Sequence, residues 1–137
     1  MTDRIERTEE EWRRILRPEE YHVLREAGTE PPFVGEYVDL DEEGIYRCRA
    51  CGNQLFDAGT KYHSGSGWPS FWKPLTPDAV VEATDTSHGR TRTEIRCGRC
   101  GSHLGHVFTD GPDPTGLRYC MNSLSLSFDE GTTPGEE

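Results

Sequence analysis

Two matched Cys-x-x-Cys pairs constrain this chain more than any other feature of its sequence. Cys48 and Cys51 form the first pair, Cys97 and Cys100 form the second, and a glycine directly follows each pair. Four thiolates satisfy the tetrahedral coordination of Zn²⁺. We therefore predict that two turns share one structural zinc ion with no open coordination position. Iron in a rubredoxin-like site and unrelated cysteines are the alternatives.

The charge balance restricts the partners that the protein can have. The 137 residues include 15 Lys and Arg against 25 Asp and Glu, which gives a formal net charge of -10. Nucleic acids and anionic membranes bind basic surfaces, so neither is expected as a partner. No apolar run is long enough to span a membrane, and the first residues contain no apolar signal segment. We expect a soluble, cytoplasmic protein.

The first part of the chain carries the only helical patterns that we identify. Residues 8–11 read as a capping box, and Pro18 suits the start of a second short helix that ends at Gly28. The residues expected to pack from these helices are Trp12, Ile15, Leu16, Tyr21, Val23 and Leu24. We interpret residues 1–35 as an N-terminal wrap over the body of the protein.

The remainder of the sequence is typical of an antiparallel, mainly β protein. Short apolar or alternating runs are separated by Gly, Pro, Asp and Asn. Strands are expected at residues 45–47, 54–56, 80–83, 90–96 and 123–128. In the last run Leu124, Leu126 and Phe128 share the expected buried face. The length predicts one domain over residues 1–137, with 129–137 as a frayed tail.

Cys120 is the thiol that the two metal pairs leave over. In an extended strand the side chains of Arg118, Cys120 and Asn122 point to one face, while those of Tyr119 and Met121 point to the other. A guanidinium beside the sulfur lowers the pKa of the thiol, and the amide can donate to a substrate oxygen. An inert buried cysteine is nevertheless the commoner case, so this pattern alone does not decide.

Two histidines favour a reactive thiol. His103 and His106 can supply protons to an oxygen leaving group near neutral pH. Their spacing places them on opposite faces of a regular strand, so we expect a β-bulge at Gly105 that turns both the same way. Ordinary structural histidines are one alternative. A second metal site is a poorer one, because no carboxylate is patterned with them, although Asp110 is near.

Residues 64–72 form a glycine-rich loop that ends in three aromatic side chains, Trp68, Phe71 and Trp72. Packing in the core would explain these aromatics. The functional alternative is an apolar wall for a small hydrophobic group, and Trp68, placed by the Trp-Pro step, is the candidate for it.

The motifs in order are Ser-Gly-Ser-Gly-Trp-Pro-Ser-Phe, the two Cys-x-x-Cys pairs, His-Leu-Gly-His-Val-Phe, Asp-Gly-Pro and Arg-Tyr-Cys-Met-Asn-Ser. From about Trp12 to Phe128 the chain resembles the B-type peptide methionine sulfoxide reductases. The resemblance implies two antiparallel β-sheets in a β-tent-like arrangement, short N-terminal helices and a structural zinc. It also implies reduction of the R epimer of methionine sulfoxide, free or in proteins, as protein repair under oxidative stress.

The resemblance implies roles for individual residues. The thiolate of Cys120 would attack the sulfoxide sulfur and remain as a sulfenic acid. The residues implied in catalysis are Cys120, His103, His106, Asn122 and Arg118, those implied in substrate binding are Trp68 and Phe108, and those implied in zinc binding are Cys48, Cys51, Cys97 and Cys100.

The chain departs from many such reductases at Ser66, where those proteins carry a second cysteine that resolves the sulfenic acid. We therefore expect an external thiol, from thioredoxin, glutaredoxin or a small molecule, to attack oxidised Cys120. We further expect a monomer. The competing hypothesis is a non-catalytic zinc-thiolate module that holds a ligand or peptide in an aromatic cage, but it leaves Cys120 and the two histidines unexplained.

Overall fold

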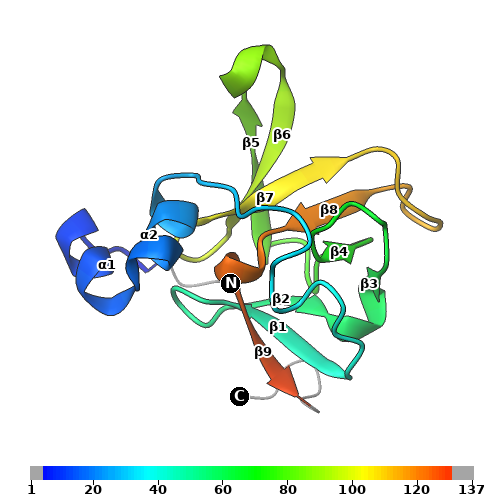
Figure 1. Cartoon of the computed structure of the whole chain (residues 1–137), viewed down its shortest axis with the longest axis horizontal. Coiled ribbons are helices and arrows are strands. Elements are labelled where there is room, and N and C mark those ends of the chain that lie inside the picture. Colours follow the sequence, from blue (N-terminus) through cyan, green and yellow to red (C-terminus); the bar gives the residue numbers. More distant parts are fainter. Residues whose placement is uncertain (1–4, 131–137) are drawn as a thin grey trace.

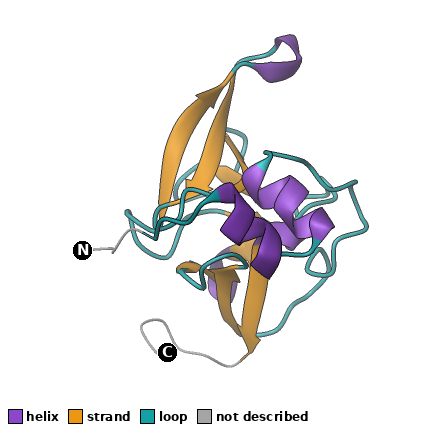
Figure 2. Ribbon diagram, turned by 90° about the vertical axis from the view of Figure 1, so that its left-hand side faces the viewer, coloured by secondary structure: helices purple, strands orange, loops and turns teal. Residues whose placement is uncertain are grey.

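Two antiparallel sheets and two short helices make up the computed structural model, which describes residues 5–130 (Figure 1). One sheet has three strands in the order β2-β1-β9, and the other has six in the order β3-β4-β8-β7-β6-β5. The expected mainly β fold with short N-terminal helices is therefore confirmed. The hairpin of β5 and β6 projects beyond the remainder of the molecule (Figure 2).

The strands are short and follow the runs that the sequence marks out. The smaller sheet contains β1 (Gly44–Cys48), β2 (Gln54–Asp57) and β9 (Leu126–Glu130). The larger sheet contains β3 (Lys61–Tyr62), β4 (Ser70–Phe71), β5 (Val80–Asp85), β6 (Arg92–Cys97), β7 (His103–Phe108) and β8 (Arg118–Met121). Single turns of 3₁₀ helix are present at η1 (Ala58–Thr60), η2 (Ser87–Gly89) and η3 (Ser123–Ser125).

The first helix, α1 (Glu9–Ile15), begins at the predicted capping box. The Thr8 hydroxyl accepts from the Glu11 amide at 3.1 Å, and the Glu11 carboxylate accepts from the Thr8 amide at 2.9 Å. Trp12 is buried, but Ile15 is 53% exposed, so the prediction that Ile15 packs is wrong. This helix has only seven residues, and it packs on the body through Trp12 and the following Leu16.

The second helix, α2 (Pro18–Arg25), buries Tyr21, Val23 and Leu24 as predicted. Ala27, with a φ of 56°, is the left-handed residue after its end, and the amide of Gly28 donates to the carbonyl of His22 at 2.9 Å. Among residues 5–130, no helix has the length and apolar character that crossing a membrane requires.

The core lies between the two sheets, and the helices close one end of it. The rings of Phe56 on β2 and Phe71 on β4 stack at a centroid distance of 4.3 Å, which joins the sheets directly. Trp12 and Leu24 belong to the same apolar cluster. Phe71 is thus a core residue, as the packing alternative for the aromatic loop predicts.

The C-terminal run differs from the prediction of one strand over residues 123–128. Its first three residues form η3, and β9 begins at Leu126, which is fully buried. Local hydrogen bonds explain the difference, because the amide of Ser125 donates to the carbonyl of Asn122 at 3.0 Å. Leu124 is therefore only partly buried. Asp129 and Glu130 belong to β9 and are not frayed, and residues 131–137 of the expected tail lie outside the described part.

Candidate active site

Strand pairing places Cys120 near the middle of the larger sheet. On one side it lies opposite Ser70 of β4, and on the other side it lies opposite His106 of β7. His106 in turn lies opposite Glu94 of β6. Side chains directly opposite one another in antiparallel strands project to the same face. Residues from four strands therefore form one cross-strand row that contains the thiol and an imidazole.

A pocket of about 270 Å³ opens over this row. The predicted site residues that line it are Trp68, His106, Phe108, Arg118, Cys120 and Asn122. Tyr119 and Met121 are 6% and 0% exposed and pack in the core, as the strand alternation predicts. His103 does not line this pocket.

A β-bulge brings the two histidines together. Ile95 pairs with Gly105 and the next residue of β6 pairs with His103, so Leu104 is the extra residue in β7. The rings of His103 and His106 consequently meet edge to face at a centroid distance of 5.4 Å. The bulge lies one residue before the predicted position. Gly105 allows β8 to approach β7 closely, since a Cβ at this position would overlap the carbonyl oxygen of Cys120.

Each histidine is held by a carboxylate, which the linear motif does not indicate. Nδ1 of His103 lies 2.7 Å from Oε2 of Glu94, and Nε2 of His106 lies 2.7 Å from Oδ2 of Asp85. Both acids come from the β5–β6 hairpin, so only the pairing of the strands could reveal them. The expectation that no carboxylate accompanies the histidines is therefore corrected.

The surroundings of His103 and of Asp85 shift the pKa values of these two side chains. Burial lowers the pKa of His103, although Glu94 acts in the opposite direction. Hydrogen bonds from Ser87, with a further contribution from His106, hold the pKa of Asp85 well below its usual range. Nε2 of His103 is buried without a hydrogen-bond partner among the described residues. A second cavity of about 560 Å³, lined in part by both histidines and both acids, lies against this pair.

The pKa of Cys120 does not follow the prediction made from Arg118. Burial raises the pKa of the thiol above its ordinary value, and a hydrogen bond with Ser66 and the charge of Arg118 only oppose this effect. The guanidinium is already paired with Asp110, at 2.9 Å from Nε to Oδ1 and 3.2 Å from Nη2 to Oδ2. It also lies over the ring of Phe108 at 4.4 Å. The expected lowering by Arg118 is present but smaller than the effect of burial.

Ser66 and Trp68, two residues of the glycine-rich loop, line the pocket together with the thiol. The hydroxyl oxygen of Ser66 lies 3.7 Å from the sulfur of Cys120 and accepts from the hydroxyl of Ser64 at 2.9 Å. The indole Nε1 of Trp68 donates to the carbonyl of Glu30 at 3.0 Å, which fixes the ring at the pocket wall. Ser66 is thus in contact with Cys120.

Asn122 connects the N-terminal wrap to the larger sheet. Its side-chain oxygen accepts from the amide of Glu30 at 3.0 Å, and its Nδ2 donates to the carbonyl of Leu104 at 3.2 Å. Glu30 therefore contacts both Asn122 and Trp68 through its own backbone. The sequence analysis missed Glu30, because no motif distinguishes it from other acids of the wrap.

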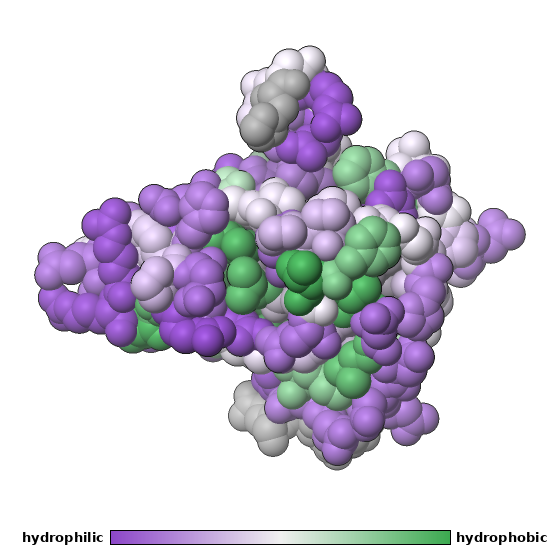
Figure 3. Space-filling view, viewed as in Figure 1, coloured by the Kyte–Doolittle hydropathy of each residue, from purple (hydrophilic) through white to green (hydrophobic). Residues whose placement is uncertain are grey.

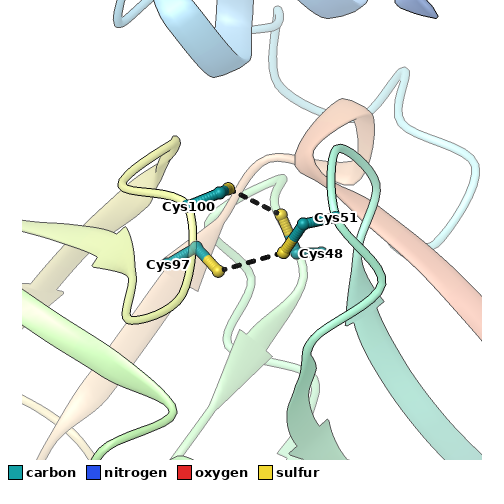
Figure 4. A group of neighbouring side chains, drawn as sticks. All are labelled: Cys48, Cys51, Cys97 and Cys100. Atoms are coloured by element: carbon teal, nitrogen blue, oxygen red, sulfur yellow. Dashed lines mark hydrogen bonds between the residues drawn. The ribbon is translucent and has the colours of Figure 1, made fainter. Parts of the chain in front are cut away.

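The four paired cysteines form one cluster (Figure 4). The sulfurs of Cys48 and Cys100 are 3.7 Å apart, those of Cys51 and Cys97 are 3.6 Å apart, and all four lie within 4.8 Å of one another. Ligand bonds of about 2.3 Å around a tetrahedral ion require sulfurs about 3.8 Å apart.

The chemistry of these sulfurs also fits a cation. Hydrogen bonds with neighbouring thiols, that of Cys100 first, raise the pKa of Cys48, so the sulfurs cannot all ionise without a positive charge among them. The cluster could therefore bind a metal ion such as zinc. No second group that could hold a metal ion is found among residues 5–130, so the alternative of a histidine metal site has no support.

Comparison with known proteins identifies the family. Residues 16–130 match the family described as the SelR domain. The chain belongs to this family. Three related proteins named peptide methionine sulfoxide reductase MsrB share this sequence at high identity. That of Agrobacterium fabrum is 54% identical over 92% of this chain and 93% of its own. The protein of Thiobacillus denitrificans is 60% identical over 89% of this chain and 92% of its own. The protein of Methanosarcina barkeri is 54% identical over 97% of this chain and 95% of its own.

The electrostatics of this SelR domain predict how fast Cys120 reacts with an alkylating agent. Arg118→Ala should slow alkylation of Cys120 by iodoacetamide at pH 8 by about threefold, because losing the guanidinium charge raises the pKa of the thiol further. Asp110→Asn should accelerate it, because the guanidinium is released from its carboxylate. Mass mapping of peptides at timed intervals separates Cys120 from the clustered cysteines.

The pH dependence of the same reaction tests the effect of burial. Since burial raises the pKa of Cys120 above the ordinary value of a thiol, the wild-type rate should still increase with pH beyond about 8.5, the pKa of an unperturbed cysteine. A rate that levels off below pH 8, or opposite responses of the two variants, would contradict this description of the site.

Proposed function

We propose that this protein reduces the R epimer of methionine sulfoxide, free or within polypeptides, to methionine at the expense of external thiols. The observation that carries the proposal is Cys120, a thiol outside the cysteine cluster, in a small pocket shared with an imidazole and two aromatic rings. Membership in the SelR family and the MsrB relatives support the same activity.

The first step, reduction of the sulfoxide, needs no oxidant or reductant other than Cys120 and the substrate. The sulfur of Cys120 attacks the sulfoxide sulfur and forms an S–S bond with it. The S–O bond of the sulfoxide then breaks as the oxygen passes to the cysteine sulfur, and the S–S bond breaks to release the thioether. The thiol and the sulfoxide thereby become a sulfenic acid and a thioether, so cysteine loses the two electrons that the substrate gains. The thiolate is the reactive form, and Arg118 assists its formation against the effect of burial.

Protons reach the sulfoxide oxygen from the histidines. His106 lines the pocket and lies opposite Cys120, so of the two histidines it is the one that faces the reacting atoms. Asp85 orients its ring through the contact between its carboxylate and Nε2. His103, outside the pocket but in ring contact with His106, supplies protons from the second cavity. Asn122 keeps this part of the pocket in place through its two backbone partners.

The aromatic wall selects the substrate. Trp68 and Phe108 provide an apolar surface for the methyl group of methionine sulfoxide, while the histidines mark the side on which oxygen must lie. A pocket with an apolar side and a protonating side distinguishes the two configurations at sulfur.

Oxidised Cys120 is then reduced by an external thiol. Ser66, the residue in contact with its sulfur, cannot form a disulfide, and the other four cysteines are grouped in the cluster. Thioredoxin, glutaredoxin or a small thiol would form a mixed disulfide with release of water, and a second thiol would restore Cys120. We also propose that the protein acts as a monomer of one domain. The free thiols suit a reducing compartment such as the cytoplasm.

The direct test incubates the protein with a racemic methionine sulfoxide peptide and dithiothreitol as reductant. The amounts of both epimers are then followed on a column that resolves them. Wild type should stop near about half conversion with the S epimer intact, and Cys120→Ser should be inactive because it lacks the nucleophile. Retention of metal in the variant shows that it is folded. Consumption of neither epimer by folded wild type would favour a non-catalytic binding module.

We also propose that the cysteine cluster holds one structural Zn²⁺. The purified protein should contain about one zinc per chain by elemental analysis, and a strong chelator should lower the Tm by about 10 °C or more, because the bound ion contributes to folding. Cys100→Ser should lose the metal, whereas Cys120→Ser should keep it. Stoichiometric iron with visible absorption would overturn the choice of zinc, and a Tm unaffected by metal loss would overturn its structural role.

A further inference from the structure

Two large apolar side chains are exposed on the N-terminal wrap. Phe33 is 69% exposed and Val34 is 67% exposed, more than any other large apolar residue described. Figure 3 shows apolar surface gathered near the centre of this face, where the loop that follows α2 crosses in Figure 1. We call these two residues the apolar rim. Water contact of this extent is unfavourable for both side chains, so the fold itself gains nothing from their position.

The backbone of the rim is held in an uncommon conformation. Phe33 has a φ of 67°, which is rare for a bulky residue. The amide of Phe33 donates to the carbonyl of Gly67 at 2.7 Å, and a Cβ on Gly67 would lie 3.0 Å from the Phe33 ring. Strained residues of this kind persist where surrounding contacts impose them, often beside functional sites.

The rim adjoins the wall of the Cys120 pocket. Gly67, whose carbonyl accepts from the amide of Phe33, immediately precedes Trp68. The indole of Trp68 in turn donates to the carbonyl of Glu30, which lies three residues before Phe33. Thr29, at the start of the same segment, lines the pocket itself. Hydrogen bonds and chain connection therefore place the apolar rim next to the segment that carries Trp68.

The size of the pocket determines what must lie over the rim. About 270 Å³ is less than a typical small-molecule site and suits one side chain. When methionine sulfoxide belongs to a polypeptide, its neighbouring residues must remain outside, against the surface around the opening. Oxidised methionine disrupts cores, so the segments that carry it and become accessible are rich in apolar residues.

We propose that the apolar rim binds apolar side chains that flank methionine sulfoxide in unfolded polypeptide substrates. This inference rests on the proposed function and adds a preference among its substrates. The surface of the protein, with its net charge of -10, favours such segments over acidic ones.

The test compares three R-sulfoxide substrates with dithiothreitol as reductant: a pentapeptide with leucine on both sides of methionine sulfoxide, the same peptide with glycine on both sides, and N-acetyl methionine sulfoxide amide. Phe33→Ala with Val34→Ser in one protein should lower kcat/KM for the leucine peptide about five- to tenfold, mainly through KM. The ratio between leucine and glycine peptides should fall toward one. Ile15→Ser with Val81→Ser is the matched control, because these residues are also exposed and apolar but lie on α1 and β5.

Several results would overturn the proposal. Equal losses on all three substrates would show that the rim only shapes the pocket, and no loss would show that it binds nothing in the reaction. A loss that appears only when thioredoxin replaces dithiothreitol as reductant would assign the rim to the reductant. A wild-type dimer that the rim variant abolishes would assign it to a second copy. Wild type inert toward all three substrates would overturn the proposed function as well, whereas an active wild type without a leucine preference overturns this inference alone.

Discussion

The meeting of four cysteine sulfurs is the interaction on which the site depends. One pair begins at Cys48, the last residue of β1 in the smaller sheet, and the other begins at Cys97, the last residue of β6 in the larger one. The sulfur contacts of 3.6 and 3.7 Å tie the two sheets together directly. β7 begins at His103, three residues after Cys100, so the position of both histidines follows from that of the second pair. The same grouping removes four of five thiols from chemistry and leaves Cys120.

From this anchor the register of the strands builds the site. Each step across the sheet adds one functional group, from Glu94 to His106 and then to Cys120. The bulge at Leu104 adds His103 to the same side. The wrap covers the end of this row and is fixed there by Glu30, whose backbone bonds both Trp68 and Asn122. A loop without regular structure thus holds two residues that line the pocket.

Residues close in sequence were predictable, and those brought together by tertiary contacts were not. The period-two alternation of a strand was enough to predict that Arg118, Cys120 and Asn122 point to the same side, where they line one pocket. Spacing and residue type were enough to predict the cysteine cluster. Asp85 and Glu94 were missed because strand register, which local sequence does not specify, decides their partners. The pKa of Cys120 depends on burial and on the pairing of Arg118 with Asp110, and neither can be read from the order of residues.

The central claim is that Cys120 alone takes up the oxygen and that no internal thiol resolves it. The most direct measurement is a single turnover of reduced, metal-replete protein with one equivalent of methionine R-sulfoxide and no reductant, trapped with dimedone and examined by intact and peptide mass spectrometry. The expected result is one dimedone adduct on Cys120 and four unmodified clustered cysteines, with about 16 Da of added oxygen when the trap is omitted. A disulfide between Cys120 and a clustered cysteine, or an adduct elsewhere, would contradict it.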